Sequence, residues 1–221
     1  TLSNNLANQV DASLDFSALT SVGNNLGLNR TATGTLNMSS LTTVTGSISI
    51  DNNNNLTSIN IPGPFTGTTA LVSVEGNVGI TSIVIGVKEI TGNVAIQNNG
   101  TALTTLSLPE LEEVGAYLDM ANNGSNDVSA TAIVSLPKLT ESGGRFRLLR
   151  AVNTLTAPLL KDVGTQNSLL TAANRAFTFQ NNAITDLDAT FPALETVGGN
   201  LTVTNNTNLN QCCIIPCKLT I

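Results

Sequence analysis

Short stretches in which apolar and polar residues alternate recur along nearly the whole chain. In the clearest copy, Val94 and Ile96 are separated by one residue, and Leu106 and Leu108 repeat this arrangement further on. Alternation with a period of two turns one face of a β-strand toward the core. Each copy therefore predicts two short strands, one for each wall of a flattened coil. The second wall is predicted at Leu14/Phe16, Ile59/Ile61, Ile83/Ile85, Leu106/Leu108, Leu155/Ala157 and Leu187/Ala189.

The copies follow one another at a spacing that predicts a solenoid. A mostly valine-like residue opens each copy, and these openers average 25 residues apart. A repeat of roughly 20 to 29 residues is typical of leucine-rich repeats and also suits a β-helix, in which stacked coils pair their strands in parallel. We predict an all-β fold with parallel sheets, a single solenoid domain over residues 1–221 with about eight coils. The openers are Val22, Val44, Val74, Ile90, Val114, Ser142, Val163 and Val197.

An Asn-Asn pair follows the first strand of most copies, between the two predicted walls. Asn tolerates left-handed backbone geometry, and identical side chains stacked at coil spacing can form a hydrogen-bonded ladder. The third coil, opened by Val74, has no such pair, so we predict a shortened coil with its first strand at Val78 and Ile80. The predicted ladder consists of Asn52, Asn98, Asn122, Asn181 and Asn205.

The composition excludes several classes of chemistry. The chain has no His, so His-based general-base catalysis, Ser-His-Asp and Cys-His arrangements, and His-containing zinc sites cannot occur. A net charge of −6 without any Lys/Arg run disfavours nucleic acid as a partner. Every apolar run is interrupted before the roughly 20 residues of a membrane-spanning helix, so we expect no membrane insertion. We expect no enzymatic activity, no cofactor and no metal site.

The three cysteines, Cys212, Cys213 and Cys217, all lie near the end of the sequence. They lack the C-x-x-C spacing and the fourth ligand of a zinc site, so we predict a disulfide between Cys217 and either Cys212 or Cys213 in an oxidising compartment. Residues 205–221 would then form a C-terminal cap of a secreted or cell-surface protein. At the other end the sequence starts within a repeat unit. We expect upstream residues or a partner to cover this end, or the N-terminal coil to mediate end-to-end self-association.

The outward positions of the first strands change their chemistry at the fifth and sixth coils. Tyr117 and Arg145 are predicted neighbours on adjacent strands, as are Asp119 and Arg147, and Arg150 follows on the same strand as the other two arginines. Exposed aromatic and arginine side chains are typical of interface hot spots, so these five residues are candidate binding residues. The alternative is that an Asp119–Arg147 ion pair and a Tyr117–Arg145 stack serve the sheet alone.

One unit near the end of the chain carries a resemblance to a known family. The stretch from Phe191 to Leu209 combines a proline, the opener Val197, a Gly-Gly bend and the Asn205-Asn206 pair. It resembles the repeat of receptor L-domain-like, leucine-rich surface proteins, and similar units cover most of the chain. The resemblance implies a right-handed β-helix-like solenoid, an extracellular location, no cofactor, and binding of protein or glycan through a sheet face or loops.

We therefore expect a non-enzymatic extracellular or cell-surface binding or adhesion module. It would recognise protein or glycan through the outer sheet face and inserted loops, chiefly the insertion at Thr165–Ala176. One alternative is a structural repeat segment that stacks end to end in a larger surface assembly. Another is an ice-binding β-solenoid, for which only Thr202 and Thr204 supply a clean pair of threonines on the outer strand face.

Overall fold

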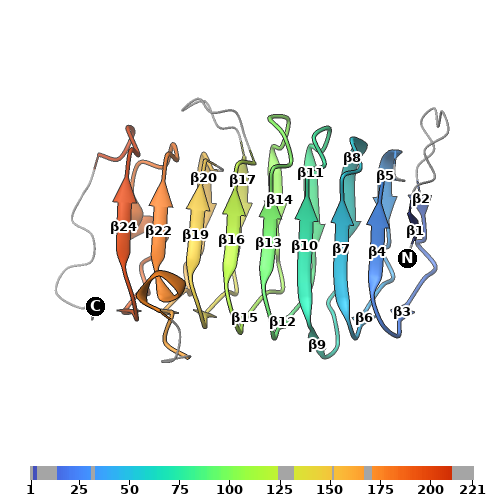
Figure 1. The fold of residues 1–221 in the computed structure, drawn as a ribbon, viewed down its shortest axis with the longest axis horizontal. Helices are drawn as coiled ribbons and strands as arrows, with labels where there is room; N and C mark the ends of the chain where they lie inside the picture. The colour runs from blue at the N-terminus through green and yellow to red at the C-terminus, as the bar shows by residue number, and fades with distance from the viewer. Residues whose placement is uncertain are drawn as a thin grey trace.

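The computed structural model describes residues 2–3, 14–30, 33–123, 132–150, 152–166 and 171–210. Within these ranges the chain winds into an elongated solenoid whose strands lie side by side, coil on coil (Figure 1). The described strands pair in parallel, and partners on successive front strands are 22 to 31 residues apart in sequence. The predicted fold class, an all-β solenoid with parallel sheets, is confirmed.

The front sheet, which faces the viewer in Figure 1, runs the length of the solenoid. Along its longer strands buried and partly exposed residues alternate, as in Ser47–Asp51, because one face packs on the core. In spatial order its nine strands are β1 (Leu2–Ser3), β4 (Leu26–Asn29), β7 (Ser47–Asp51), β10 (Leu71–Glu75), β13 (Val94–Gln97), β16 (Leu118–Ala121), β19 (Phe146–Leu149), β22 (Phe177–Gln180) and β24 (Leu201–Thr204).

The back sheet forms the opposite wall. Its seven strands are β2 (Leu14–Asp15), β5 (Thr33–Asn37), β8 (Asn55–Ile61), β11 (Ser82–Ile85), β14 (Thr105–Ser107), β17 (Ile133–Ser135) and β20 (Thr154–Thr156). The apolar residues of both walls point into one continuous core, in which Ile50 and Ile61 have no exposed surface. Burial of each such side chain contributes about 1.5 to 3 kcal/mol, so the stacked interior is the main stabilising term.

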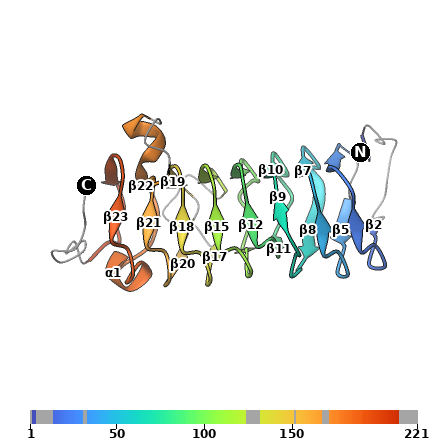
Figure 2. The same cartoon turned by 90° about the horizontal axis from the view of Figure 1, so that it is seen from below.

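A third, narrow sheet closes the coil along one edge, in addition to the two predicted walls (Figure 2). It is built from two-residue strands at the opener positions, each ending on an inward residue. This edge sheet comprises β9 (Thr68–Thr69), β12 (Glu89–Ile90), β15 (Glu113–Val114), β18 (Glu141–Ser142), β21 (Asp162–Val163) and β23 (Thr196–Val197), and β3 (Ser21–Val22) pairs with β6 (Thr43–Val44) separately.

The third coil differs from the prediction, because its opener is Thr69 rather than Val74. Val74 instead lies within β10, where it pairs with Ile50 and Ile96 of the neighbouring front strands. The predicted strand at Val78 is wrong, since that side chain is 53% exposed. The opener of this coil, Thr69, is polar, whereas most openers of the other coils are apolar. The sequence pattern therefore predicted the opener of this coil too far along the chain.

The asparagine ladder exists, but its main row lies one residue beyond the predicted one. Asn53, Asn77, Asn99 and Asn123 are buried, and each of the first three donates from Nδ2 to Oδ1 of the next, at 3.1 Å. Each also caps a front-strand carbonyl of the preceding coil, as in the 2.7 Å bond from Asn99 Nδ2 to the oxygen of Val74. A further segment joins Asn182 to Asn206.

The asparagines predicted to form the ladder have a different role. Their backbones adopt the left-handed conformation that turns the chain away from the front strand, and Asn is the non-glycine residue that tolerates it best. Only Asn122 and Asn98 bond to each other, at 3.1 Å. These first asparagines are Asn52, Asn98, Asn122, Asn181 and Asn205, with φ between 54° and 57°.

The predicted strand at Leu187 and Ala189 is wrong, because this segment is the short helix α1 (Leu187–Thr190). Asp186 caps the helix by accepting a hydrogen bond from the Ala189 amide, and Leu187 still points into the core. The helix delivers Phe191 to an aromatic cluster, edge-on to Phe146 and Phe177 at 5.9 and 5.2 Å. The N-cap Asp186 and the core position of Phe191 after the helix favour a helix here over another strand of the back sheet.

Some predictions fall on residues outside the described ranges. These are the disulfide of Cys217 with Cys212 or Cys213, most of the C-terminal cap, and most of the N-terminal coil expected to mediate self-association. Among the described residues no helix is long and apolar enough to cross a membrane.

Candidate functional site

The outward residues of the front sheet form a broad face, called here the front face. Because the strands are in register, its side chains stand in columns across the coils. The middle column reads Gly27, Ser49, Ser73, Ala95, Asp119, Arg147, Thr178 and Thr202. The column before it includes Leu71, Tyr117, Arg145 and Ala176, and the column after it includes Asp51, Glu75, Gln97 and Leu149.

Tyr117, Asp119, Arg145 and Arg147 meet on β16 and β19, as the sequence predicted, and are called here the arginine cluster. Asp119 is opposite Arg147 in register, and its carboxylate pairs with both arginines. Arg147 Nη2 donates to Asp119 Oδ2 at 2.9 Å, and the Arg145 guanidinium lies 4.6 Å from the centre of the Tyr117 ring. Two cations around one carboxylate leave a net charge of +1.

Burial differs sharply within the arginine cluster. The Asp119 side chain is only 1% exposed, whereas Arg145 and Arg147 are 28% and 31% exposed. A buried carboxylate is costly unless it is paired and hydrogen-bonded, so Asp119 fixes the two arginines while they remain at the surface. Arg150 follows the end of β19 in the left-handed conformation, with φ 53°, and is exposed.

The insertion after Val163 lies directly beside the arginine cluster. It contains the short 3-10 helix η1 (Ala172–Arg175) and leads into Ala176, whose carbonyl accepts a 2.9 Å bond from the amide of Phe146. Figure 2 shows this turn rising beyond the front sheet next to β22. It can approach the coil because Gly144 has no side chain: a Cβ there would lie 3.1 Å from the Asn174 carbonyl. Residues 172–176, the described end of the insertion, therefore form a raised border to the front face.

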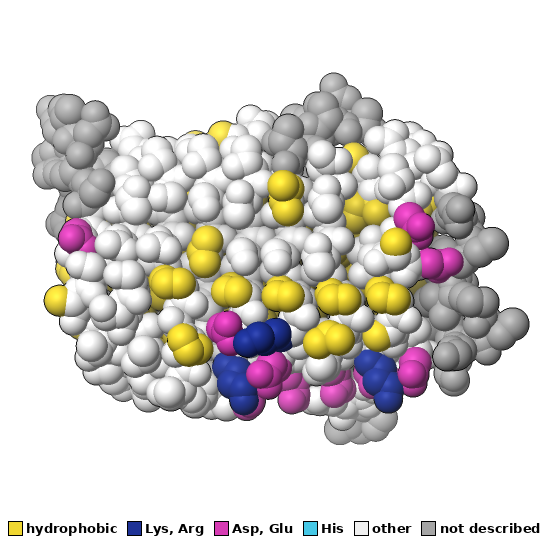
Figure 3. Space-filling view, turned by 180° about the vertical axis from the view of Figure 1, so that it is seen from behind, with side chains coloured by type: hydrophobic (Ala, Val, Ile, Leu, Met, Phe, Trp, Pro, Cys, Tyr) yellow, Lys and Arg dark blue, Asp and Glu magenta, His cyan; other side chains and the backbone are white. Residues whose placement is uncertain are grey.

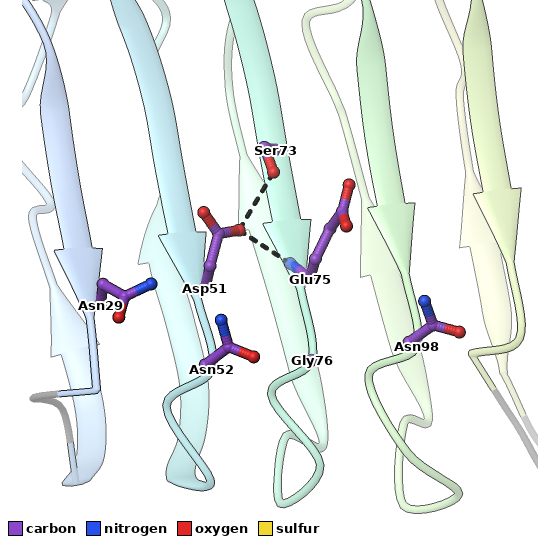
Figure 4. A pocket seen from close by; sticks show the side chains of 7 residues that line it. All are labelled: Asn29, Asp51, Asn52, Ser73, Glu75, Gly76 and Asn98. Atoms are coloured by element: carbon purple, nitrogen blue, oxygen red, sulfur yellow. Dashed lines mark hydrogen bonds between the residues drawn. The ribbon is translucent and has the colours of Figure 1, made fainter.

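A second polar cluster lies on β7 and β10, which the single strand β13 separates from the arginine cluster on β16 and β19. The Asp51 carboxylate accepts hydrogen bonds from the Ser73 hydroxyl at 3.0 Å and from the Glu75 amide at 3.2 Å, and also from Ser49 (Figure 4). Partial burial raises the pKa of the Glu75 carboxyl above its ordinary value, and the negative charges of Asp51 and Asp119 add to this. This part of the front face is therefore acidic.

These acidic residues border an open hollow of about 450 Å³. Gly76 lines this hollow between Asn52 and Asn98 and occupies the left-handed position that asparagine holds on either side (Figure 4). A Cβ at Gly76 would lie 2.8 Å from Asn52 Oδ1, so glycine leaves room there for the Asn52 side chain. Ser73 and Glu75 were not predicted from the sequence, because the third coil was predicted in the wrong register. Reading Gly76-Asn77 as a variant Asn-Asn pair would have found them.

Most of the charge away from the front face lies along one edge of the described molecule, although Asp15 ends β2 of the back sheet and Asp186 and Asp188 lie at α1. Figure 3 shows the basic side chains and most of the visible acidic ones gathered along that edge, with a few acidic side chains near the two ends of the back. Glu89, Glu113, Glu141 and Asp162 stand in one column of the edge sheet. Lysines accompany the acidic residues here, and hydrogen bonding to Glu112 raises the pKa of Lys88. The described residues hold no group of three acidic or Cys side chains placed to bind a metal.

Comparison of the chain with protein-family profiles, with curated proteins and with solved structures finds no match. The fold and the geometry of the front face are therefore the basis for assigning a function.

Proposed function

We propose that this chain is a non-enzymatic binding or adhesion module of the cell surface or extracellular space, and that the front face is its contact surface. The observation that carries the proposal is the arginine cluster, in which a buried Asp119 holds two surface arginines and Tyr117 beside the raised insertion. Aromatic and arginine side chains held rigidly are the usual anchors of binding surfaces. The resemblance to receptor L domains supports the same location and role.

The chemistry of the front face favours a glycan over a protein as ligand. Half of the residues in its columns from β4 to β24 are Ser, Thr, Asn or Gln, whose side chains offer both hydrogen-bond donors and acceptors to sugar hydroxyls. Stable protein interfaces need an apolar centre. Among the described outward residues of the three columns, Leu71 and Leu149 are the only large aliphatic side chains.

The proposal predicts that blocking the front face abolishes glycan binding without unfolding the protein. Thr178→Tyr places a bulky ring on β22 beside Arg147, and Thr105→Tyr places the same ring on the back sheet as a matched control. Both positions are partly exposed strand residues, so the two melting temperatures should remain close to that of the unchanged chain. On an array of neutral and acidic glycans, the Thr178 variant should lose binding and the Thr105 variant should keep it. Equal binding by both variants would refute the front face as the contact surface.

A further inference from the structure

We infer that the arginine cluster binds the acidic groups of a polysaccharide, namely a uronate carboxylate or a sulfate ester, laid across β16, β19 and β22. The inference rests on the proposed function, because it assumes a glycan on the front face and adds the charge of that glycan. The shared chemistry is an oxyanion on a sugar ring, and the two sources are separated in the test below.

The two arginines keep binding capacity after pairing with Asp119. The ion pairs engage Nη2 of Arg145 and both Nε and Nη2 of Arg147, so Nη1 of each guanidinium is left for a second acceptor. Both side chains are about three-tenths exposed, while Asp119 is buried beneath them. A planar guanidinium matches the two oxygens of a carboxylate or sulfate and gives short, charge-assisted hydrogen bonds. The net charge of +1 remains for the ligand.

The cluster is also held in place before any ligand arrives. Asp119 fixes both guanidiniums from below. The Arg145 guanidinium also packs on the Tyr117 ring, with its central carbon 4.6 Å from the ring centroid. Long side chains that are already ordered lose little rotamer entropy on binding, which increases affinity for a given set of contacts. Rigid surface arginines therefore favour a specific anion site over a flexible charged patch.

The charge distribution of the whole chain points to the same ligand. Four of its nine basic residues lie in the arginine cluster or next to it, although the net charge is −6. Arg150 directly follows β19, and Arg175 is the last residue of η1 beside the cluster. A positive region on an otherwise acidic protein steers an anionic ligand toward one place.

The neighbouring residues favour a sugar chain of limited footprint. Thr178 and Thr202 continue the middle column beyond Arg147 and supply hydroxyl groups, which hydrogen-bond to neutral parts of a sugar. In the other direction Asp51 and Glu75 would repel an acidic chain. The polysaccharide should therefore lie from the arginine cluster toward β24 and not extend over β7 and β10.

The inference is tested by calorimetry at low and moderate salt with four probes: an oligogalacturonate, a heparin fragment, neutral dextran and poly-L-glutamate. The first two distinguish carboxylate from sulfate, and poly-L-glutamate tests an acidic polypeptide instead. Arg145→Gln and Arg147→Gln should each weaken binding of the acidic oligosaccharide by about tenfold, the value of one charged hydrogen-bonding group.

Two further variants guard against misfolding and against a general charge effect. Replacing both arginines would leave Asp119 buried and unpaired, so the double change is made together with Asp119→Asn, which keeps the site neutral. The charge control is Lys138→Gln on the edge sheet side, which lowers the net charge by one, as each single arginine variant and the triple variant also do. This control should bind the acidic oligosaccharide as the unchanged chain does.

The inference is overturned if neither acidic oligosaccharide binds, if both variants and the lysine control lose affinity equally, or if poly-L-glutamate binds more tightly than either oligosaccharide. Binding of neutral glycans that is lost in the Thr178→Tyr variant, without binding of acidic ones, would refute this inference and leave the proposed function standing. A chain that binds neither kind of glycan would refute both.

Discussion

Glu75 shows how a single residue of the front face responds to its surroundings. Partial burial disfavours its carboxylate, and the charges of Asp51 and Asp119 disfavour it further, so its pKa is raised. A carboxyl with a folded-state pKa above its unfolded value stabilises the fold when both states are protonated. That contribution is lost as the pH rises through the folded pKa. At neutral pH the ionised Glu75 therefore opposes folding.

Replacing this carboxyl by a neutral isostere should stabilise the protein at neutral pH. We expect Glu75→Gln to raise the melting temperature at pH 7 by a few degrees at most, because the side chain remains partly exposed. The gain should shrink as the pH falls and vanish below the ordinary value of 4.5. Thermal unfolding of both proteins at pH 7 and below pH 4.5 measures the difference in melting temperature. In the control Glu195→Gln, which removes a carboxylate 3.5 Å from Lys161, no such gain is expected.

The asparagine ladder is the element that joins one turn of the solenoid to the next on the inside. Asn99 donates to Val74 and Asn123 and accepts from both the amide and the side chain of Asn77. Because the site is buried, no water replaces these bonds when the side chain is removed. The adjacent Asn98 is exposed and contributes mainly its tolerance of the left-handed backbone.

Two neighbouring asparagines should therefore differ strongly in their contribution to stability. We expect Asn99→Ala to lower the free energy of unfolding by about 2 to 4 kcal/mol, since it leaves several buried groups unpaired. The matched variant Asn98→Gly should cost less than about 1 kcal/mol, because glycine adopts the same backbone conformation freely. Urea denaturation of both variants gives the comparison. Similar losses would mean that the ladder bonds contribute no more than the turn.

On the scale of the whole molecule, the solenoid presents different chemistry on each side. The front face is polar with separated acidic and basic regions, and the edge sheet side carries most of the remaining charge. The visible rest of the back is largely uncharged, with a few acidic side chains near its two ends (Figure 3). Each coil contacts mainly its neighbours, so stability is a sum of local coil and interface contributions. Coils near the middle have two neighbours, and those at the ends of the described fold have one.

This architecture predicts a gradient of local stability along the long axis. Backbone amides of β10, β13 and β16 should exchange most slowly with deuterated solvent, and those of β2 and β24 fastest. Hydrogen exchange followed by mass spectrometry resolves these segments. Uniform protection from β2 to β24 would instead indicate a single cooperative unit. In the Asn99→Ala variant the slow exchange should be lost first in the middle coils.

Local rules in the sequence were enough to determine the solenoid, its parallel sheets and the left-handed asparagines. Alternation, repeat spacing and backbone preference act within a few residues or between identical neighbours, so they can be read without coordinates. The pairing of Tyr117, Asp119, Arg145 and Arg147 also followed, because strand register carries over between adjacent coils. These features needed only the period of the repeat.

Tertiary packing decided everything that departs from that period. The register of the third coil depends on which residues fill the core, and Thr69 gave no apolar signal for it. The ladder runs through the second asparagine because only that side chain turns inward to reach the preceding coil. The helix at Leu187, the acidic hollow beside Gly76 and the insertion next to Arg145 each depend on contacts between residues far apart in sequence. The places where the repeat is interrupted are thus where structure, and the proposed binding site, add to the sequence.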